Sequence, residues 1–215
     1  MKKAIRGLLS LAILLFAAAA NAVTLTAGAS FFNPTGVEGN GGALFSFGVG
    51  QRVDEMVLAN IQVDYFNKSF TKEITTPVDV GSGGIVNIQN RVVAYNHSVK
   101  YFPLTAGAVI SLPVGDIIRP YIEGRVGFGL AHVSYDYNQN LYAIPAAGRP
   151  ESGTYTGFGW RIGGGARMRL GHRSALLAGM YYNGNTVSRS QNANVFSDLK
   201  MSGIGFGAGL ELSGF

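Results

Sequence analysis

The last sixteen residues of the chain, Lys200–Phe215, read KMSGIGFGAGLELSGF. Apolar residues alternate there with glycine or glutamate. Successive side chains of a strand point to opposite faces, so one face would carry Ile204, Phe206 and Leu210, and the other mainly glycine. The glycine face lacks the bulk and polarity of a solvated exterior. An apolar outside with a small or polar inside is typical of a transmembrane β-barrel.

The same alternation recurs along the chain, and it predicts an all-β fold: an eight-stranded antiparallel up-and-down transmembrane β-barrel. The predicted strands span 24–32, 42–52, 57–66, 91–102, 119–134, 156–170, 174–187 and 200–215. No charged residue lies on the faces assigned to lipid, where Arg or Lys would cost ~2–4 kcal/mol at the midplane. A soluble sandwich would instead bury the large residues and expose the glycines. In the fourth segment Val99 and Tyr101 are assigned to lipid and Lys100 to the lumen.

The connections between these segments alternate in length. Those at 33–41, 67–90, 135–155 and 188–199 are long and polar, whereas 53–56 and 171–173 are short. This matches long extracellular loops and short periplasmic turns. Residues 103–118 break the rule, because a periplasmic turn is expected there and the segment is long and apolar. It holds a short helix, extends the flanking strands, or adds two strands to make a barrel of ten.

The first residues form an export signal. Lys2, Lys3 and Arg6 precede an apolar run, and Ala20-Asn21-Ala22 fits a small-x-small cleavage site. We therefore expect residues 1–22 to be a signal peptide and 23–215 to be the outer-membrane barrel domain; a retained anchor is the alternative. The apolar run is short for a spanning helix, which needs about 20 residues.

Composition narrows the function further. The chain has 17 Lys and Arg against 12 Asp and Glu, and without the three cations of the signal 14 remain, a charge of +2. No dense basic stripe is left, so nucleic-acid binding is not expected. The chain has no cysteine, so no disulfide can stabilise it after export. Its three histidines have no metal-site spacing, and neither a metal nor a cofactor is expected.

The inward parity of the strands collects charged residues in the lumen. The predicted lumen charge network is Arg52, Asp64, Lys100, Glu123, Arg125, Arg161, Arg167, Arg169 and Glu211. An eight-stranded lumen is just wide enough for side chains to fill, and buried charges must be paired, so these residues are expected to form a structural plug. A narrow, anion-preferring path for small solutes is the alternative. Glu123, Arg125 and Arg161 are the favoured pair members.

Two other features offer alternative functions. His132 and Ser134 both face lipid near the outer end of the fifth segment, an arrangement similar to that of lipid A deacylase barrels. No carboxylate stands at a suitable offset to complete a triad, so no enzyme is predicted. The longest loops carry the aromatic residues Phe70, Tyr137, Tyr142 and Tyr155, and these are expected to be exposed for surface binding unless the loops are passive.

Two motifs carry a family resemblance. The stretches Ser98-Val99-Lys100-Tyr101-Phe102-Pro103-Leu104 and Arg119-Pro120-Tyr121-Ile122-Glu123-Gly124-Arg125-Val126-Gly127-Phe128-Gly129 are similar to the fourth and fifth strands of small Gram-negative outer-membrane barrels. These are the opacity-type and outer-membrane-protein-A-type proteins, often called the porin family. The resemblance implies a location in the outer membrane, contact with its lipid and lipopolysaccharide, and a monomer. It also implies that Phe215 is recognised by the outer-membrane assembly machinery.

Overall fold

A computed structural model describes residues 23–36, 41–77, 89–137, 152–189 and 198–214. The predicted signal peptide and Phe215 lie outside these residues, and so does Tyr142. No helix in the described part of the chain is long and apolar enough to cross a membrane. The described strands are β1 (Val23–Pro34), β2 (Gly42–Arg52), β3 (Val57–Pro77), β4 (Gln89–Ser111), β5 (Ile118–Tyr137), β6 (Gly153–Arg169), β7 (Ser174–Ser188), β8 (Asp198–Lys200) and β9 (Gly203–Ser213).

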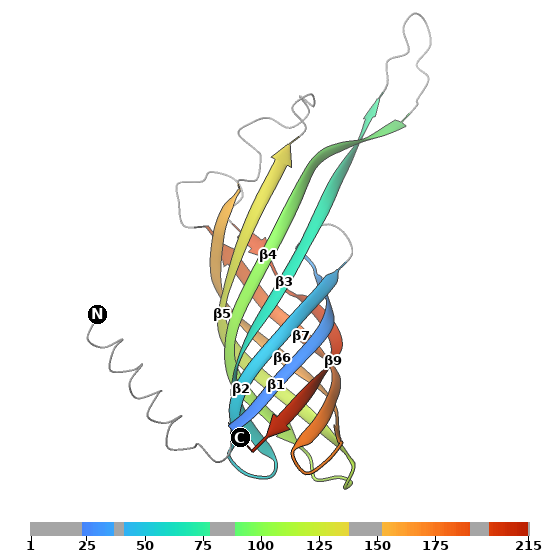
Figure 1. Cartoon of the computed structure of the whole chain (residues 1–215). Helices are drawn as coiled ribbons and strands as arrows, with labels where there is room; N and C mark the ends of the chain where they lie inside the picture. Colours follow the sequence, from blue (N-terminus) through green and yellow to red (C-terminus); the bar gives the residue numbers. More distant parts are fainter. Residues whose placement is uncertain (1–22, 37–40, 78–88, 138–151, 190–197, 215) are drawn as a thin grey trace, which may run out of the picture.

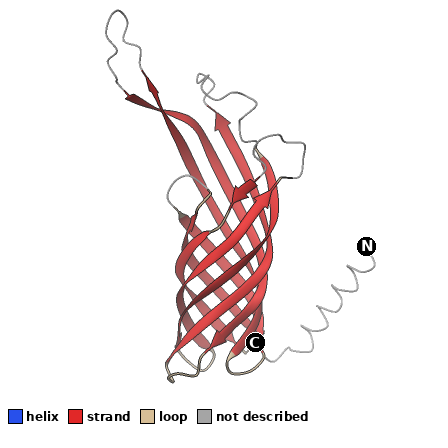
Figure 2. Ribbon diagram, turned by 180° about the vertical axis from the view of Figure 1, so that it is seen from behind, coloured by secondary structure: helices blue, strands red, loops and turns tan. Residues whose placement is uncertain are grey.

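Eight of these strands close into a barrel, as predicted. Each long strand pairs antiparallel with the next from β1 to β7, β9 pairs with both β7 and β1, and the ring is complete. Figure 2 shows the closed ring of tilted strands from behind. The short β8 pairs only with the end of β7, and Met201 and Ser202 separate it from β9. The ten-stranded alternative is therefore wrong.

The two ends of the barrel differ. At one end, called the turn end, β1 begins, β9 finishes, and short turns join β2 to β3, β4 to β5 and β6 to β7 (Figure 1). In the first of these turns, Asp54 Oδ1 accepts hydrogen bonds from the backbone N–H groups of Met56 and Val57, both at 2.7 Å. Residues 103–118 belong to this end and form no helix: β4 continues to Ser111 and leaves only a short turn before β5.

The opposite end, called the loop end, carries strands that are longer than predicted. Beyond Phe66 the β3–β4 pair continues to Pro77 and Gln89, although β2 has already stopped pairing with β3. From Phe66 to Pro77 this ribbon is about 36 Å long, at roughly 3.3 Å per residue, and it rises above the barrel in Figure 1. Its register shifts between Lys72 and Glu73. Most of the predicted loop 67–90 is therefore strand.

The apolar side chains of the barrel point outward, which confirms the central prediction of the sequence. Phe128, Phe158 and Phe206 are 51%, 68% and 57% exposed, and they do not meet in a core. Phe128 and Phe158 are cross-strand neighbours, and the rings of Phe206 and Phe31 lie 5.4 Å apart on the same outer face. A surface of this kind is stable only against hydrocarbon.

This polarity reverses near the loop end. On the outer face, Tyr65, Phe102 and Leu130 lie side by side on β3, β4 and β5; we call them the boundary row. Two residues further toward the loop end, the outward side chains are polar. We call them the polar row: Asn67, Lys100, His132 and Thr154. Apolar side chains point inward at the same level. The strands thus leave hydrocarbon at the boundary row and continue as an ordinary water-exposed sheet.

The reversal corrects the parity assigned to the fourth segment. Val99 and Tyr101 are fully buried inside, whereas Lys100 is exposed on the outer face. The prediction used the membrane rule for a stretch of β4 that lies beyond the boundary row. The lipid-facing stretch of β4 is its second half, where Phe102 and Leu104 are exposed.

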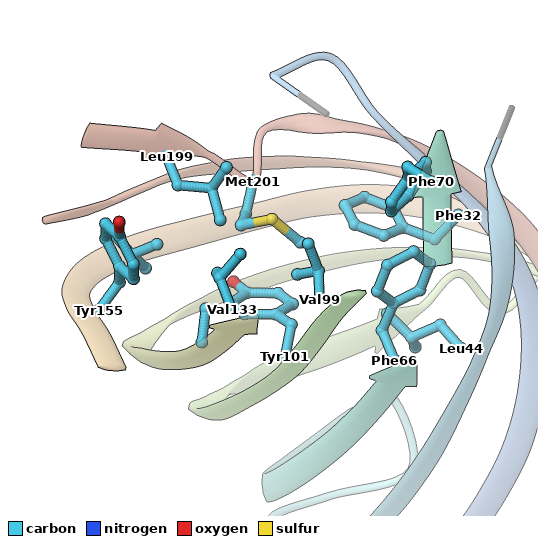
Figure 3. Close-up of a cluster of buried hydrophobic side chains, with 12 residues drawn as sticks. Phe32, Leu44, Phe66, Phe70, Val99, Tyr101, Val133, Tyr155, Leu199 and Met201 are labelled. Carbon is cyan, nitrogen blue, oxygen red and sulfur yellow. The ribbon is translucent and has the colours of Figure 1, made fainter. Parts of the chain in front are cut away.

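The inward apolar residues form a cluster that fills the loop end of the lumen. Its members are Phe32, Leu44, Phe66, Phe70, Val99, Tyr101, Ala131, Val133, Tyr155, Val187, Leu199 and Met201. Figure 3 shows Phe32 and Phe66 facing one another, and their ring centroids are 5.6 Å apart. Phe70 and Tyr155 are 4% and 3% exposed, so their prediction as exposed loop aromatics is wrong. Loop-end strands contribute them, and they pack inward.

Candidate functional site

The lumen below the apolar cluster holds the candidate site, and its first layer lies at the turn end. Glu211 on β9 accepts hydrogen bonds from two arginines, Arg52 on β2 and Arg167 on β6. The Arg167 Nη2 to Glu211 Oε1 distance is 2.8 Å, and Glu211 is 2% exposed. β9 lies between β2 and β6 in the ring but contacts neither directly as a sheet partner. The layer therefore links strands that the sheet does not join.

The second layer centres on Arg125 of β5. Its guanidinium contacts Glu123 Oε2 at 3.0 Å, and its Nη1 donates to Asn60 Oδ1 at 2.6 Å. Glu123 and Arg125 are separated by one residue, so alternation places both on the inner face. Asn60 lies on β3, two strands away from β5. One guanidinium thus satisfies a carboxylate on its own strand and an amide from further round the ring.

The third layer crosses the lumen from β6 to β3. Arg161 Nη2 lies 2.5 Å from Asp64 Oδ2, and the two residues are 3% and 0% exposed. Gln62 Nε2 donates to Asp64 Oδ1 at 2.6 Å, and Arg161 Nε donates to Asn183 Oδ1 at 3.0 Å. The Arg161 guanidinium carbon also lies 4.2 Å from the centre of the Tyr181 ring. Each buried charge therefore has several partners, as burial requires.

Arg125 and Arg161 face one another across the β5–β6 ladder. Like charges directly opposite each other in a sheet are destabilising. Here each guanidinium has its own carboxylate, Glu123 for the first and Asp64 for the second. The two pairs therefore depend on each other, because removing either carboxylate leaves one guanidinium without a counter-charge directly opposite the other guanidinium.

Inward glycines make room for the larger interior side chains. A Cβ on Gly129 would lie 2.6 Å from Asn185 Nδ2 and 2.9 Å from a ring carbon of Tyr101. Asn185 donates in turn to the Tyr101 hydroxyl at 2.7 Å, a bond that spans the lumen from β7 to β4. On β1, Ser30 lies 2.8 Å from the Tyr181 hydroxyl. The glycines that alternate with apolar residues in the sequence thus line the lumen, and the larger inward side chains pack against them.

A cavity of about 110 Å³ remains between the ionic layers. Arg125, Arg161, Glu123 and Tyr121 line it together with the small residues of β1 and β9. Asn60 Nδ2 is buried beside it and has no hydrogen-bond partner in the described part of the chain. A space of this size suits water, which would satisfy such a donor.

The structure brings most of the predicted lumen charges together. Seven of them point inward and belong to the three ionic layers: Arg52, Asp64, Glu123, Arg125, Arg161, Arg167 and Glu211. Lys100 does not belong, because it lies on the outer face. Arg169 has the inward parity of Arg167, but it lies exposed at the end of β6, outside the layers. The sequence reading missed the apolar cluster, since it assumed that the membrane pattern held along whole strands.

The outer face does not assemble a hydrolytic triad among the residues that the structure describes. His132 and Ser134 share the exposed outer face of β5, but they lie beyond the boundary row and not against hydrocarbon, so their prediction as lipid-facing residues is wrong. The His132 Nδ1 atom, however, lies 3.4 Å from the Thr154 hydroxyl, where a triad needs a carboxylate. Asp136 is four residues further along the strand, about 13 Å away. No group of three or more possible metal-binding His, Asp or Glu side chains occurs within the described ranges.

Comparison with known proteins agrees with this architecture. Among solved structures, Neisserial surface protein A is similar with a TM-score of 0.57 and 14% identity, over 88% of this chain and 96% of that one. OprG from Pseudomonas aeruginosa has a TM-score of 0.51 and 12% identity, over 90% of this chain and 96% of that one. At these identities the likeness concerns the fold.

Sequence relatives cover less of the chain. A protein of Brucella suis biovar 1 (strain 1330) and one of Brucella melitensis biotype 1 (strain ATCC 23456) are each 31% identical over 98 residues. The match covers 45% of this chain and 34% of each relative, and both are described as uncharacterized. Residues 7–211 match the family described as outer membrane protein beta-barrel domain. The predicted resemblance is thereby confirmed, and the chain belongs to the outer membrane protein beta-barrel domain family.

Proposed function

We propose that this protein is an exported barrel of the Gram-negative outer membrane whose lumen is closed and whose activity is the binding of partners at the cell surface. The observation that carries the proposal is the filling of the lumen. Three ionic layers cross it, and the apolar cluster follows them at the loop end. A solute path would have to break charge pairs and displace packed aromatic rings together.

The ribbon of β3 and β4 supports the surface role. It extends well past the barrel on the side of the long connections, which in barrels of this type is the extracellular side. Its outer face is polar beyond the boundary row, with Ser69, Thr71 and Asn96 exposed, and Thr71 donates to Asn96 at 2.8 Å. A paired sheet outside the membrane can present a defined surface, which a passive loop cannot.

A planar-bilayer recording tests the closed lumen. Refolded protein should insert without steady current steps, whereas detergent alone and an open porin serve as blank and positive control. Steady single-channel steps would overturn the closed lumen. An absence of current supports the closed lumen only if the barrel is folded. Heat-dependent gel mobility and a strand-rich circular dichroism spectrum show that it is.

A narrow passage for small solutes is the second candidate, favoured by the cavity beside Arg125 and Arg161. If the recording shows current, Arg161→Ala and Glu123→Ala should change its anion-to-cation preference, because both side chains would line the path. An unchanged preference would place the path elsewhere. Binding of lipopolysaccharide, recognition by the assembly machinery through Phe215, and the monomeric state stay predictions.

A further inference from the structure

Because Lys100 points outward, it lies beside His132 on the outer face of the barrel, which the sequence pattern did not predict. Lys100 on β4 and His132 on β5 are direct cross-strand partners on the outer face, and Asn67 and Thr154 flank them on β3 and β6. All four side chains are exposed. Directly opposite residues have their Cβ atoms about 4.5–5.5 Å apart, so the ammonium and the imidazole can reach one ligand together.

The groups in this row are available for a ligand. No described residue forms an ion pair with Lys100. His132 uses Nδ1 toward the Thr154 hydroxyl, which leaves Nε2 as the ring nitrogen for another partner. Asn67 adds an amide N–H that can donate to an oxygen atom, and the Thr154 hydroxyl orients the imidazole through its contact with Nδ1. The polar row therefore places hydrogen-bond donors beside the Lys100 ammonium. This arrangement suits an anion with several oxygen acceptors.

The depth of the row indicates where that anion comes from. The next residues toward the membrane are the boundary row, in which the rings of Tyr65 and Phe102 lie 4.9 Å apart and Phe102 and Leu130 are about 40% exposed. Aromatic side chains at the end of an apolar band mark the membrane interface. A cation one step beyond lies at the level of lipid headgroups, within reach of their phosphates and still attached to a rigid sheet.

We propose that Lys100 and His132, with Asn67 and Thr154, bind a phosphate group of a phosphorylated outer-leaflet glycolipid such as lipid A. The lipid chains then lie along the apolar face below the boundary row, and the sugar rests against the polar outer face of β4 and β5 above it. The proposal rests on the proposed placement in the outer membrane and does not depend on whether the lumen conducts.

Native mass spectrometry of the refolded protein in detergent tests the site, with bisphosphorylated lipid A and enzymatically dephosphorylated lipid A as probes. The wild-type protein should bind the phosphorylated form more tightly, by about fivefold for each cation engaged. Lys100→Ala with His132→Ala should lose that preference. The matched control is Arg173→Ala with His172→Ala, which removes a cation and an imidazole from the exposed turn at the other end and should keep the preference.

Several outcomes would overturn the proposal: an equal preference in the wild type and the Lys100/His132 variant, an equal loss in the control, or equally tight binding of phosphatidylglycerol. Inorganic phosphate, followed by ³¹P NMR with protein in phosphatidylcholine nanodiscs, separates the two sources of the group. Broadening of its signal that depends on Lys100 would mean that free phosphate is the ligand and overturn the lipid assignment; the expected result is none. Gel mobility before and after heating shows whether the barrel has formed. A failure of the barrel itself is thereby distinguished from a failure of the site.

Discussion

Removal of Arg161 is the most informative perturbation of the lumen. In Arg161→Met, Asp64 keeps only its hydrogen bond from Gln62 and stays at 0% exposure as an unpaired carboxylate. Breaking a buried pair by deleting one partner costs about 3–5 kcal/mol. Asn183 loses a donor and Tyr181 loses its contact with the guanidinium in the same change. These losses are not additive, so we expect the free energy of unfolding to fall by about 3–5 kcal/mol in total.

The second variant of this test removes both charges. Arg161→Met with Asp64→Leu replaces the pair by apolar side chains, which is often neutral or stabilising. Gln62 and Asn183 then lack partners, at about 1–3 kcal/mol for each group left unsatisfied, so the double variant should recover part of the stability lost by the single one. Arg169→Met, on the same strand but exposed at its end, should change the stability by less than about 0.5 kcal/mol.

Urea unfolding of the protein in lipid vesicles measures these differences. The chain has one tryptophan, Trp160, and its ring is exposed on the outer face of β6, so its fluorescence reports the loss of lipid contact. The reasoning is refuted if Arg161→Met costs under about 1 kcal/mol, or if the double variant is no more stable than Arg161→Met. Either result would mean that water or chain movement already satisfies Asp64.

Three further predictions use the same unfolding assay. Phe128→Arg should cost up to about 2–4 kcal/mol because it places a cation against hydrocarbon, whereas Ser134→Arg, on the same face of β5 but past the boundary row, should cost less than about 0.5 kcal/mol; equal costs would contradict the reversal of polarity. Gly129→Ala should destabilise by about 1–3 kcal/mol through crowding of the Asn185 and Tyr101 pair, whereas Gly124→Ala, which meets nothing within 4 Å, should not; similar effects at both positions would remove the space argument. Phe66→Ala should cost about 3–5 kcal/mol as a cavity in the apolar cluster, and a loss under about 1 kcal/mol would indicate that the cluster is loosely packed.

Much of this barrel follows from alternation along the chain. Period-two patterns at Gly203–Ser213 and in β1, β2, β5 and β6 predicted strands, their number and the outward side of Phe128, Phe158 and Phe206. The reason is local: in a strand, residue parity alone assigns a face, and only one face tolerates bulky apolar groups next to lipid. The inward position of Glu123, Arg125 and Arg161 follows from the same rule.

Residue parity could not predict which side chains contact one another inside the lumen. It also could not predict where along each strand the membrane ends. The contact between Arg161 and Asp64 depends on strands three places apart in the ring, and therefore on the register and tilt of every strand between them. Lys100 was misassigned because a pattern of alternation states which residues share a face but not which solvent that face meets. Along β4 the solvent changes from water to hydrocarbon within one step, between Lys100 and Phe102, and only the closed ring with its neighbours at Tyr65 and Leu130 shows where.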